Sequence, residues 1–121
     1  MQPETLLALA GQKVDDAYNS VSAPLYQTAN FRFEDVGETK GFDYTRSGNP
    51  TRLALETTLC DLDGGVGAVC VSTGMGAVST TLALFDSDAH VICSHDCYGG
   101  TDRLLRHLEK QGKLTASFVD L

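Results

Sequence analysis

From Asn49 to the C-terminus the chain alternates between strand-like and helix-like segments, and this alternation constrains its fold more than any other feature. Short apolar runs are typical of buried strands, whereas leucines three or four residues apart are typical of helices. We expect a helix from Pro50 to the Gly64-Gly65 pair, a strand over 66–71, a helix over 77–85, a strand over 89–94, a helix from Thr101 to Gly112 and a strand over 114–119. This order predicts an α/β fold with a parallel sheet and right-handed crossovers.

Two of these helices carry start signals in the sequence. Asn49 precedes Pro50, and asparagine is a favoured N-cap while proline suits the first helical position. Thr101 is expected to cap the later helix. The expected apolar positions are Leu55, Leu59 and Leu62 in the first helix and Leu104, Leu105 and Leu108 in the later one.

The first 50 residues contain few periodic apolar stretches, so they predict an extended N-terminal arm. Pro24 supports extended backbone here because the residue before a proline is pushed out of the helical region. The arm contains enough apolar residues that we expect it to lie across a partner subunit. The predicted organisation is therefore an intersubunit arm over 1–50, which contributes to a cofactor site, and an α/β domain that begins at 51 and continues to 121.

Composition excludes several classes of partner. Acidic residues outnumber basic ones by 16 to 9, giving a formal charge of −7, whereas nucleic-acid surfaces cluster Lys and Arg. No stretch approaches the ~20 apolar residues of a membrane span, and the N-terminus lacks the basic region of an export signal. We expect a cytoplasmic protein with neither nucleic-acid nor membrane partners. Its cysteines are expected to be reduced thiols: Cys60, Cys70, Cys93 and Cys97.

Residues 44–51 read Tyr-Thr-Arg-Ser-Gly-Asn-Pro-Thr and contain a candidate phosphate clamp. Tyr44 and Arg46 are two residues apart, so in an extended arm their side chains point the same way. An arginine supplies a forked, charged donor that suits phosphate. The alternative is a surface arginine beside a turn made by residues 47–50.

Residues 72–76 read Ser-Thr-Gly-Met-Gly and lie between an expected strand and an expected helix. Free backbone amides and the helix dipole make such a corner an anion site, and glycine lets a phosphate approach closely. The alternative is an ordinary strand-to-helix turn. A dinucleotide-binding fingerprint does not fit, because Ser79 occupies its third glycine position.

Residues 97–101 read Cys-Tyr-Gly-Gly-Thr and follow the strand expected over 89–94. Open parallel sheets bind ligands at this end of their strands, which makes Tyr98 a candidate site residue; its alternative is a half-buried packing role. Nearby lies a rival set of possible zinc ligands: His90, Cys93, His95 and Cys97. On an extended strand Cys93, His95 and Cys97 would share one face, but ligands along one strand do not wrap a tetrahedron, so we predict no metal site.

In their order and spacing these three motifs resemble the Cys/Met-metabolism family of pyridoxal-phosphate enzymes. The resemblance implies a fold-type-I α/β architecture, in which an N-terminal arm is followed by the start of a mainly parallel sheet with helices on both faces. It implies pyridoxal 5′-phosphate as cofactor, with its phosphate on the amides of Gly74 and Met75 and its ring against Tyr98, whose hydroxyl assists proton transfer. Tyr44 and Arg46 would reach into the site of a neighbouring subunit, which implies a homodimer or homotetramer.

The resemblance also implies a substrate and a reaction. Arg103 matches an arginine that holds the carboxylate of an amino-acid substrate; its alternative is a solvated charge beside Asp102. The first choice of reaction is the cystathionine gamma-synthase type, in which cysteine replaces the acyl group of an O-acylhomoserine. Cystathionine beta- or gamma-lyase and O-acylhomoserine sulfhydrylase activities remain open.

The lysine that carries the cofactor lies in a Ser-x-Thr-Lys setting in this family. That setting is absent around the four lysines here: Lys13, Lys40, Lys110 and Lys113. We therefore expect the chain to be an N-terminal portion that is inactive by itself. A non-catalytic remnant is the alternative from another class.

Overall fold

The computed structural model describes residues 1–12 and 17–121, so that Lys13 lies outside the described residues. The chain divides into two compact units, Met1–Cys70 and Val71–Leu121. No helix in the described ranges combines the length and apolar composition that a membrane crossing needs. Each unit contains some of the candidate site residues and is described by itself.

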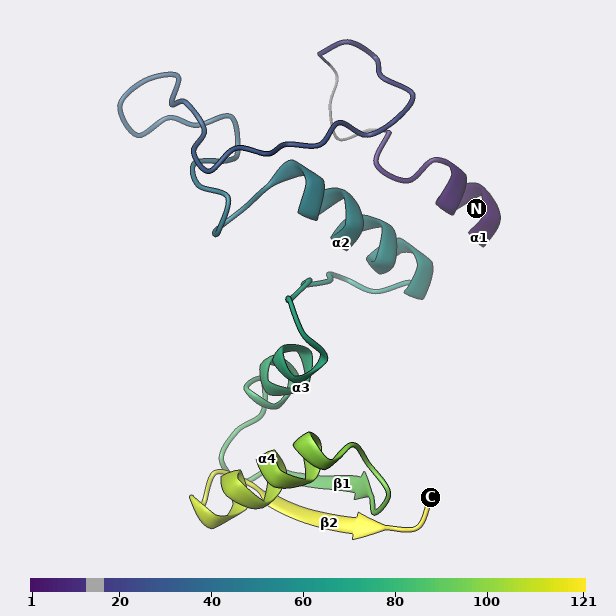
Figure 1. Cartoon of the computed structure of the whole chain (residues 1–121), viewed down its shortest axis with the longest axis vertical. Helices are drawn as coiled ribbons and strands as arrows, with labels where there is room; N and C mark the ends of the chain where they lie inside the picture. Colours follow the sequence, from purple (N-terminus) through teal and green to yellow (C-terminus); the bar gives the residue numbers. More distant parts are fainter. Residues whose placement is uncertain (13–16) are drawn as a thin grey trace. The chain divides into compact units, whose positions relative to one another are not determined.

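Two helices organise the N-terminal unit: α1 (Pro3–Ala8) packs against α2 (Pro50–Asp63) (Figure 1). The expected extended arm is therefore not extended throughout. Pro3 stands at the start of α1 and Glu4 lies in its first turn, and both features favour a helix N-terminus.

The middle of the arm folds back on itself. The amide of Phe31 donates to the carbonyl of Asp43 at 2.8 Å, and the amide of Thr45 donates to the carbonyl of Ala29 at 2.9 Å. These bonds flank an antiparallel bridge between Asn30 and Tyr44. The Tyr44 segment is therefore held as an extended strand-like piece before α2 begins.

The helix predicted from Pro50 is confirmed. The side chain of Asn49 accepts a hydrogen bond from the amide of Thr51 at 2.8 Å, and Pro50 occupies the first turn. The helix ends at Gly64, whose φ of 63° is left-handed and suits glycine. Caps at both ends explain why the sequence predicted this helix well.

The strand expected over 66–71 is wrong, because this segment pairs with no strand of the described chain. Val66 and Val69 are exposed, and the amide of Cys70 donates to the carboxylate of Glu56 at 2.9 Å. An apolar run predicts burial, but a strand also needs a neighbour to accept its backbone hydrogen bonds. Here a helix side chain takes one of those bonds instead.

The C-terminal unit contains the predicted parallel pair. Strand β1 (His90–Ser94) runs parallel to β2 (Thr115–Val119) and pairs from His90 with Thr115 through to Ser94 with Val119. Helix α4 (Gly99–Lys110) connects them and packs against β2, while α3 (Gly74–Leu82) packs against α4 (Figure 1). This strand–helix–strand unit confirms the alternation seen in the sequence.

Both helices of this unit begin earlier than expected. Helix α3 covers Gly74–Leu82 rather than 77–85, because the Thr73 side chain accepts from the amide of Gly76 at 2.9 Å and caps it three residues sooner. Helix α4 starts at Gly99, and Thr101 is not its cap. The amide of Thr101 donates instead to the carbonyl of Tyr98 at 2.8 Å, within the first turn.

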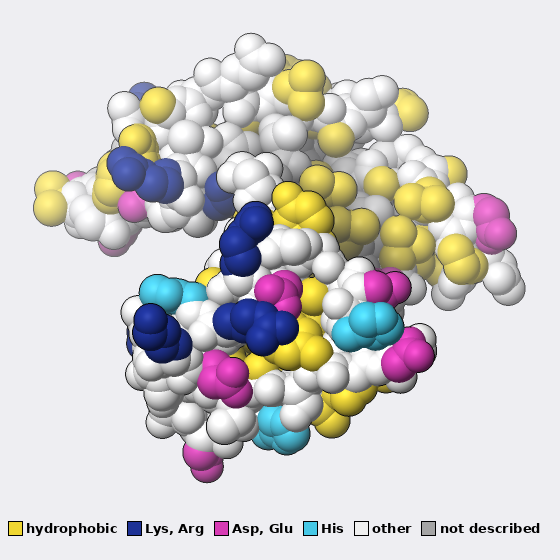
Figure 2. Space-filling view, turned by 60° about the horizontal axis from the view of Figure 1, so that its bottom comes forward, with side chains coloured by type: hydrophobic (Ala, Val, Ile, Leu, Met, Phe, Trp, Pro, Cys, Tyr) yellow, Lys and Arg dark blue, Asp and Glu magenta, His cyan; other side chains and the backbone are white. Residues whose placement is uncertain are grey.

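Leu105 and Leu114 are the buried apolar residues described in the C-terminal unit, with Leu105 only 1% exposed. Beside Leu105, an apolar hollow of about 330 Å³ lies between α3, β1 and α4. Figure 2 shows hydrophobic side chains at the surface among charged side chains of both signs. The core of this unit therefore depends mainly on the packing of α4.

Candidate functional site

The N-terminus of α3 presents free backbone donors. Thr73 is extended, with φ −148° and ψ 152°, and its hydroxyl accepts a hydrogen bond from the amide of Gly76. Gly74 and Met75 come first in the helix, where amides have no partner within the helix itself. A side chain built on Gly74 would meet nothing within 4 Å, so the space in front of this turn is open. The corner has the donors and the room that an anion needs.

Tyr98 precedes α4 and displays its ring. It stands at the N-cap position with φ −52° and ψ 130°, and its side chain is largely exposed. A Cβ added to Gly100 would lie 2.7 Å from Cε1 of Tyr98 and 3.0 Å from Sδ of Met75. The Tyr98 ring, Gly100 and the Met75 side chain therefore lie together.

A single cleft of about 600 Å³ joins these features within the C-terminal unit. It is lined by Thr73, Gly74, Met75, Val78, Tyr98 and Thr101. Three of the site residues predicted from the sequence, Gly74, Met75 and Tyr98, therefore line one cleft. Thr73 and Thr101 are additions that the sequence analysis assigned to a turn and a cap.

Tyr44 and Arg46 form a pair in the N-terminal unit. Nη2 of Arg46 donates to the hydroxyl of Tyr44 at 3.2 Å, and the guanidinium carbon lies 5.1 Å from the centre of the Tyr44 ring. Both side chains are exposed. The extended backbone assumed from their spacing is wrong at Arg46, because residues 45–47 form a turn. The two side chains nevertheless meet, and the cation rests on an aromatic face.

Arg103 lies exposed on α4 and takes part in no ion pair among the described residues. Its neighbour Asp102 is instead bonded to Arg106, whose Nε lies 2.9 Å from Oδ1 of Asp102. That pair follows the four-residue spacing of a helix face. Arg103 therefore keeps its guanidinium available at the surface.

The rival cysteine and histidine set does not share one strand face. Strand β1 ends at Ser94, and the chain then turns, with the amide of Cys97 donating to the carbonyl of Ser94 at 3.2 Å. Nδ1 of His95 approaches Oδ1 of Asp120 at 3.6 Å. Desolvation raises the pKa of the Cys97 thiol, and the nearby Cys93 thiol raises it further. Across the described ranges, His, Cys, Asp and Glu form no group of three that could hold a metal.

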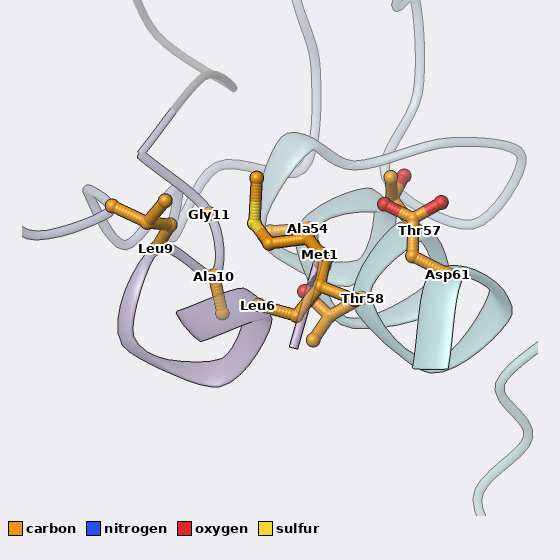
Figure 3. Close-up of a pocket in the computed structure, with 9 residues that line it drawn as sticks. All are labelled: Met1, Leu6, Leu9, Ala10, Gly11, Ala54, Thr57, Thr58 and Asp61. Carbon is orange, nitrogen blue, oxygen red and sulfur yellow. Dashed lines mark hydrogen bonds between the residues drawn. The ribbon is translucent and has the colours of Figure 1, made fainter. Parts of the chain in front are cut away.

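A separate hollow of about 190 Å³ lies between α1 and α2 in the N-terminal unit (Figure 3). Its lining is mainly small and apolar, with Asp61 as its one charged side chain: Met1, Leu6, Leu9, Ala10, Gly11, Ala54, Thr57, Thr58 and Asp61. None of the predicted site residues lines it. We therefore assign it to the packing of the two helices.

Sequence reasoning missed two residues of α2 that support the Tyr44–Ser47 turn. Arg52 donates to carbonyls of that turn, and Glu56 forms an ion pair with Arg52 at 3.5 Å. The available signal was the four-residue spacing of an arginine and a glutamate on one helix. That spacing indicates an ion pair, but it does not reveal the backbone partners.

The family model of Cys/Met metabolism PLP-dependent enzymes matches residues 4–121. The chain belongs to this family. The chain has the architecture of the N-terminal part of a fold-type-I enzyme. It superimposes on the crystal structure of cystathionine gamma synthase from Xanthomonas oryzae pv. oryzae in complex with aminoacrylate and cysteine, with a TM-score of 0.88 at 39% identity. The match covers 100% of this chain and 32% of that one.

Two curated relatives carry different activities. Cystathionine gamma-synthase/O-acetylhomoserine (thiol)-lyase of Bacillus subtilis (strain 168) is 41% identical over 117 residues, covering 97% of this chain and 31% of the relative. Cystathionine beta-lyase of Lactococcus lactis subsp. cremoris (strain MG1363) is 37% identical over 118 residues, covering 98% and 31%. The chain thus spans about a third of the length of these relatives, and synthase and lyase relatives resemble it to similar degrees.

Proposed function

We propose that this chain supplies the phosphate-binding and ring-stacking walls of the cofactor site in a pyridoxal-phosphate-dependent transsulfuration enzyme. The observation that carries the proposal is the single cleft lined by Gly74, Met75 and Tyr98. Membership of a PLP-dependent family supports the choice of cofactor.

The residues around the cleft fit this cofactor chemically. Pyridoxal phosphate combines a dianionic phosphate with a flat aromatic ring. The first turn of α3 offers two unpaired amides and the positive end of a helix, and a glycine there leaves room for close approach. The exposed ring of Tyr98 lines the same cleft and offers a stacking face.

When bound, pyridoxal phosphate supplies an electron sink for chemistry at the α-carbon of an amino acid. The amides of Gly74 and Met75 bind the phosphate and fix the position of the ring. Tyr98 covers one ring face, and its hydroxyl holds or moves a proton. Arg103 binds the carboxylate of the substrate through its guanidinium fork. The Tyr44–Arg46 pair binds the phosphate in a neighbouring subunit, so the working enzyme is a homodimer or homotetramer.

The reaction we favour is replacement of the acyl group of an O-acylhomoserine by cysteine, which yields cystathionine. The Bacillus subtilis relative named as a synthase and (thiol)-lyase supports it. Cystathionine beta- or gamma-lyase activity is the alternative, supported by the Lactococcus lactis relative. A cytoplasmic location remains a prediction of the sequence.

A second candidate function is that these 121 residues bind the cofactor without performing chemistry on it. The observation that favours it is the lining of the cleft, which among the described residues contains no lysine. Lys40 forms an ion pair with Glu34 at 3.2 Å, while Lys110 and Lys113 lie at and beyond the end of α4.

Equilibrium dialysis against pyridoxal phosphate and against pyridoxal tests the proposal. Charge-assisted hydrogen bonds to the phosphate predict binding that is at least about tenfold tighter for the phosphorylated form. Equal affinity would overturn the phosphate assignment. Borohydride reduction followed by intact mass then tests whether any lysine of this chain carries the cofactor: no fixed cofactor is expected, and a cofactor fixed on one lysine would contradict the non-catalytic role.

A further inference from the structure

The turn that carries Arg46 is held by backbone bonds of its own. The amides of Ser47 and Gly48 both donate to the carbonyl of Tyr44 at 3.0 Å. These backbone bonds do not use the carbonyls of residues 45–47 as acceptors. The Ser47 hydroxyl adds bonds to the Tyr44 carbonyl and to Oδ1 of Asp43, and none of these bonds uses the carbonyls of residues 45–47. Those three carbonyls need a donor from outside the turn.

Arg52 provides that support from the first turns of α2. Its Nη1 donates to the carbonyl of Thr45 at 3.2 Å. Its Nη2 donates to the carbonyls of Arg46 at 3.4 Å and Ser47 at 3.1 Å. Three successive carbonyls, including that of Arg46 itself, are therefore bonded to one guanidinium. A planar fork can serve such a row of acceptors, whereas the ammonium of lysine is a point donor on a flexible stem.

Glu56 holds the other edge of the same guanidinium. Its Oε1 lies 3.5 Å from Nε of Arg52, and its side chain is only 18% exposed. The same oxygen accepts from the amide of Cys70 at 2.9 Å. Glu56 is thus fixed by two partners, which orients the Arg52 side chain toward the turn.

Asn49 completes a row on one face of α2. With its side chain it donates to the carbonyl of Tyr26 at 3.0 Å and to the hydroxyl of Thr45 at 2.8 Å, and it is 8% exposed. Residues 49, 52 and 56 follow the three- and four-residue spacing of neighbours on a helix. Each contacts backbone or a side chain outside the helix, so this face of α2 serves as a rigid support for the arm.

The geometry points to Arg52, oriented by Glu56, as a positioning residue for the Tyr44–Arg46 pair. Arg52 fixes the carbonyls of residues 45–47. It thereby keeps the Arg46 guanidinium on the Tyr44 ring as a preformed anion clamp. This inference rests on the proposed function, in which Tyr44 and Arg46 bind phosphate. It adds a requirement for Arg52 and Glu56, to which the proposed function gives no part in phosphate binding.

The test uses the full 121-residue chain, isotope-labelled for NMR, with inorganic phosphate as the probe. Arg52→Lys keeps a positive charge beside Glu56 but loses the fork. Arg106→Lys is the matched control, because Arg106 is also an α-helical arginine paired with a carboxylate four residues away. Arg46→Gln is the benchmark for the clamp itself. The readouts are amide exchange at Ser47 and Gly48, amide exchange at Leu53 in α2, and the response of the Arg46 Nε resonance to phosphate.

In Arg52→Lys we expect exchange at Ser47 and Gly48 to accelerate about tenfold and phosphate affinity at Arg46 to fall by a similar factor. Leu53 stays protected, because its amide bonds to the carbonyl of Asn49 within the intact helix. Arg106→Lys changes neither readout. Unchanged exchange, unchanged phosphate affinity, or equal loss of protection at Leu53 would each overturn the positioning role.

The clamp formed by Tyr44 and Arg46 and the positioning role of Arg52 are tested separately by these variants. If phosphate does not perturb Arg46 in the natural chain, or if Arg46→Gln leaves phosphate binding intact, the clamp in the proposed function is wrong. In that case Arg52 has no role in phosphate binding. Amide exchange at Ser47 and Gly48 still decides whether Arg52 holds the turn. If Arg46→Gln abolishes the response and Arg52→Lys does not alter it, the clamp stands and only the role of Arg52 is wrong.

Discussion

At the scale of single residues, Gly100 makes room for the ring of Tyr98. A Cβ at this position would lie 2.7 Å from Cε1 of Tyr98, which is closer than carbon atoms approach without displacement. It would also lie 3.0 Å from Sδ of Met75, so an added methyl group would press on two side chains. A larger residue at this position therefore conflicts with the present place of the ring, and not with the backbone angles of Gly100.

Gly100→Ala should displace the Tyr98 ring and weaken the binding of pyridoxal phosphate about three- to tenfold, the range expected for a lost aromatic stacking contact. Gly99→Ala is the matched control, since nothing lies within 4 Å of a Cβ at that position. Equilibrium dialysis of both variants gives the comparison. Equal affinities for the two variants would show that the ring position does not matter for binding.

Asp43 provides a second test at this scale. The hydroxyl of Ser47 donates to Oδ1 of Asp43 at 2.9 Å and, with the amide of Tyr44, holds the pKa of this carboxyl below its ordinary value of 3.8. A lowered pKa in the folded state means that ionised Asp43 stabilises the turn above pH 3.8, and that this stability is lost as the pH falls through the lower folded value.

Ser47→Ala should therefore raise the pKa of Asp43 toward 3.8. An NMR titration of the side-chain carboxyl carbon of Asp43, in the natural chain and in the variant, measures the shift directly. The same pKa in both chains would mean that the Ser47 bond does not stabilise the ionised carboxyl.

At the scale of elements, α4 carries most of the core of the C-terminal unit. Leu105 is 1% exposed and lies on the helix that packs against β2 and α3. Its side chain also lines the apolar hollow between α3, β1 and α4. A cavity already present beside it limits how far the neighbours can collapse when the side chain is shortened.

Leu105→Ala should lower the free energy of unfolding by about 2–5 kcal/mol, the usual range for truncating a buried leucine. Leu84→Ala is the control, because Leu84 is 79% exposed. Urea unfolding followed by circular dichroism measures both. Equal midpoints for the two variants would contradict the assignment of Leu105 to the core.

Helices and strands were predictable from the sequence where a local signal decided them. Asn49 and Pro50 fix the start of α2, and Gly64 fixes its end. The start of α3 was placed too late because Thr73 was assigned to a turn, although threonine is a common N-cap. The segment over 66–71 could not be judged from its own residues, since whether an apolar run becomes a strand depends on a neighbour to pair with.

At the scale of the whole molecule, the candidate site was predictable in its parts and not in its support. The order of the motifs predicted that Gly74, Met75 and Tyr98 belong together, and one cleft contains them. The support that Arg52 and Glu56 give to the turn was missed, because hydrogen bonds from a side chain to the backbone carbonyls of another segment leave no pattern in a sequence. Gly74, Met75 and Tyr98 were marked as candidates by their residue types and order, whereas the contacts of Arg52 are visible only in three dimensions.

The central claim is that pyridoxal phosphate binds with its phosphate at the N-terminus of α3 and its ring on Tyr98. The most direct measurement is an NMR titration of the labelled chain with pyridoxal phosphate, followed by the same titration with pyridoxal. We predict that the amides of Gly74 and Met75 shift only with the phosphorylated form, and that the ring protons of Tyr98 shift with both. Shifts that avoid these amides, or amide shifts of equal size with pyridoxal, would contradict it.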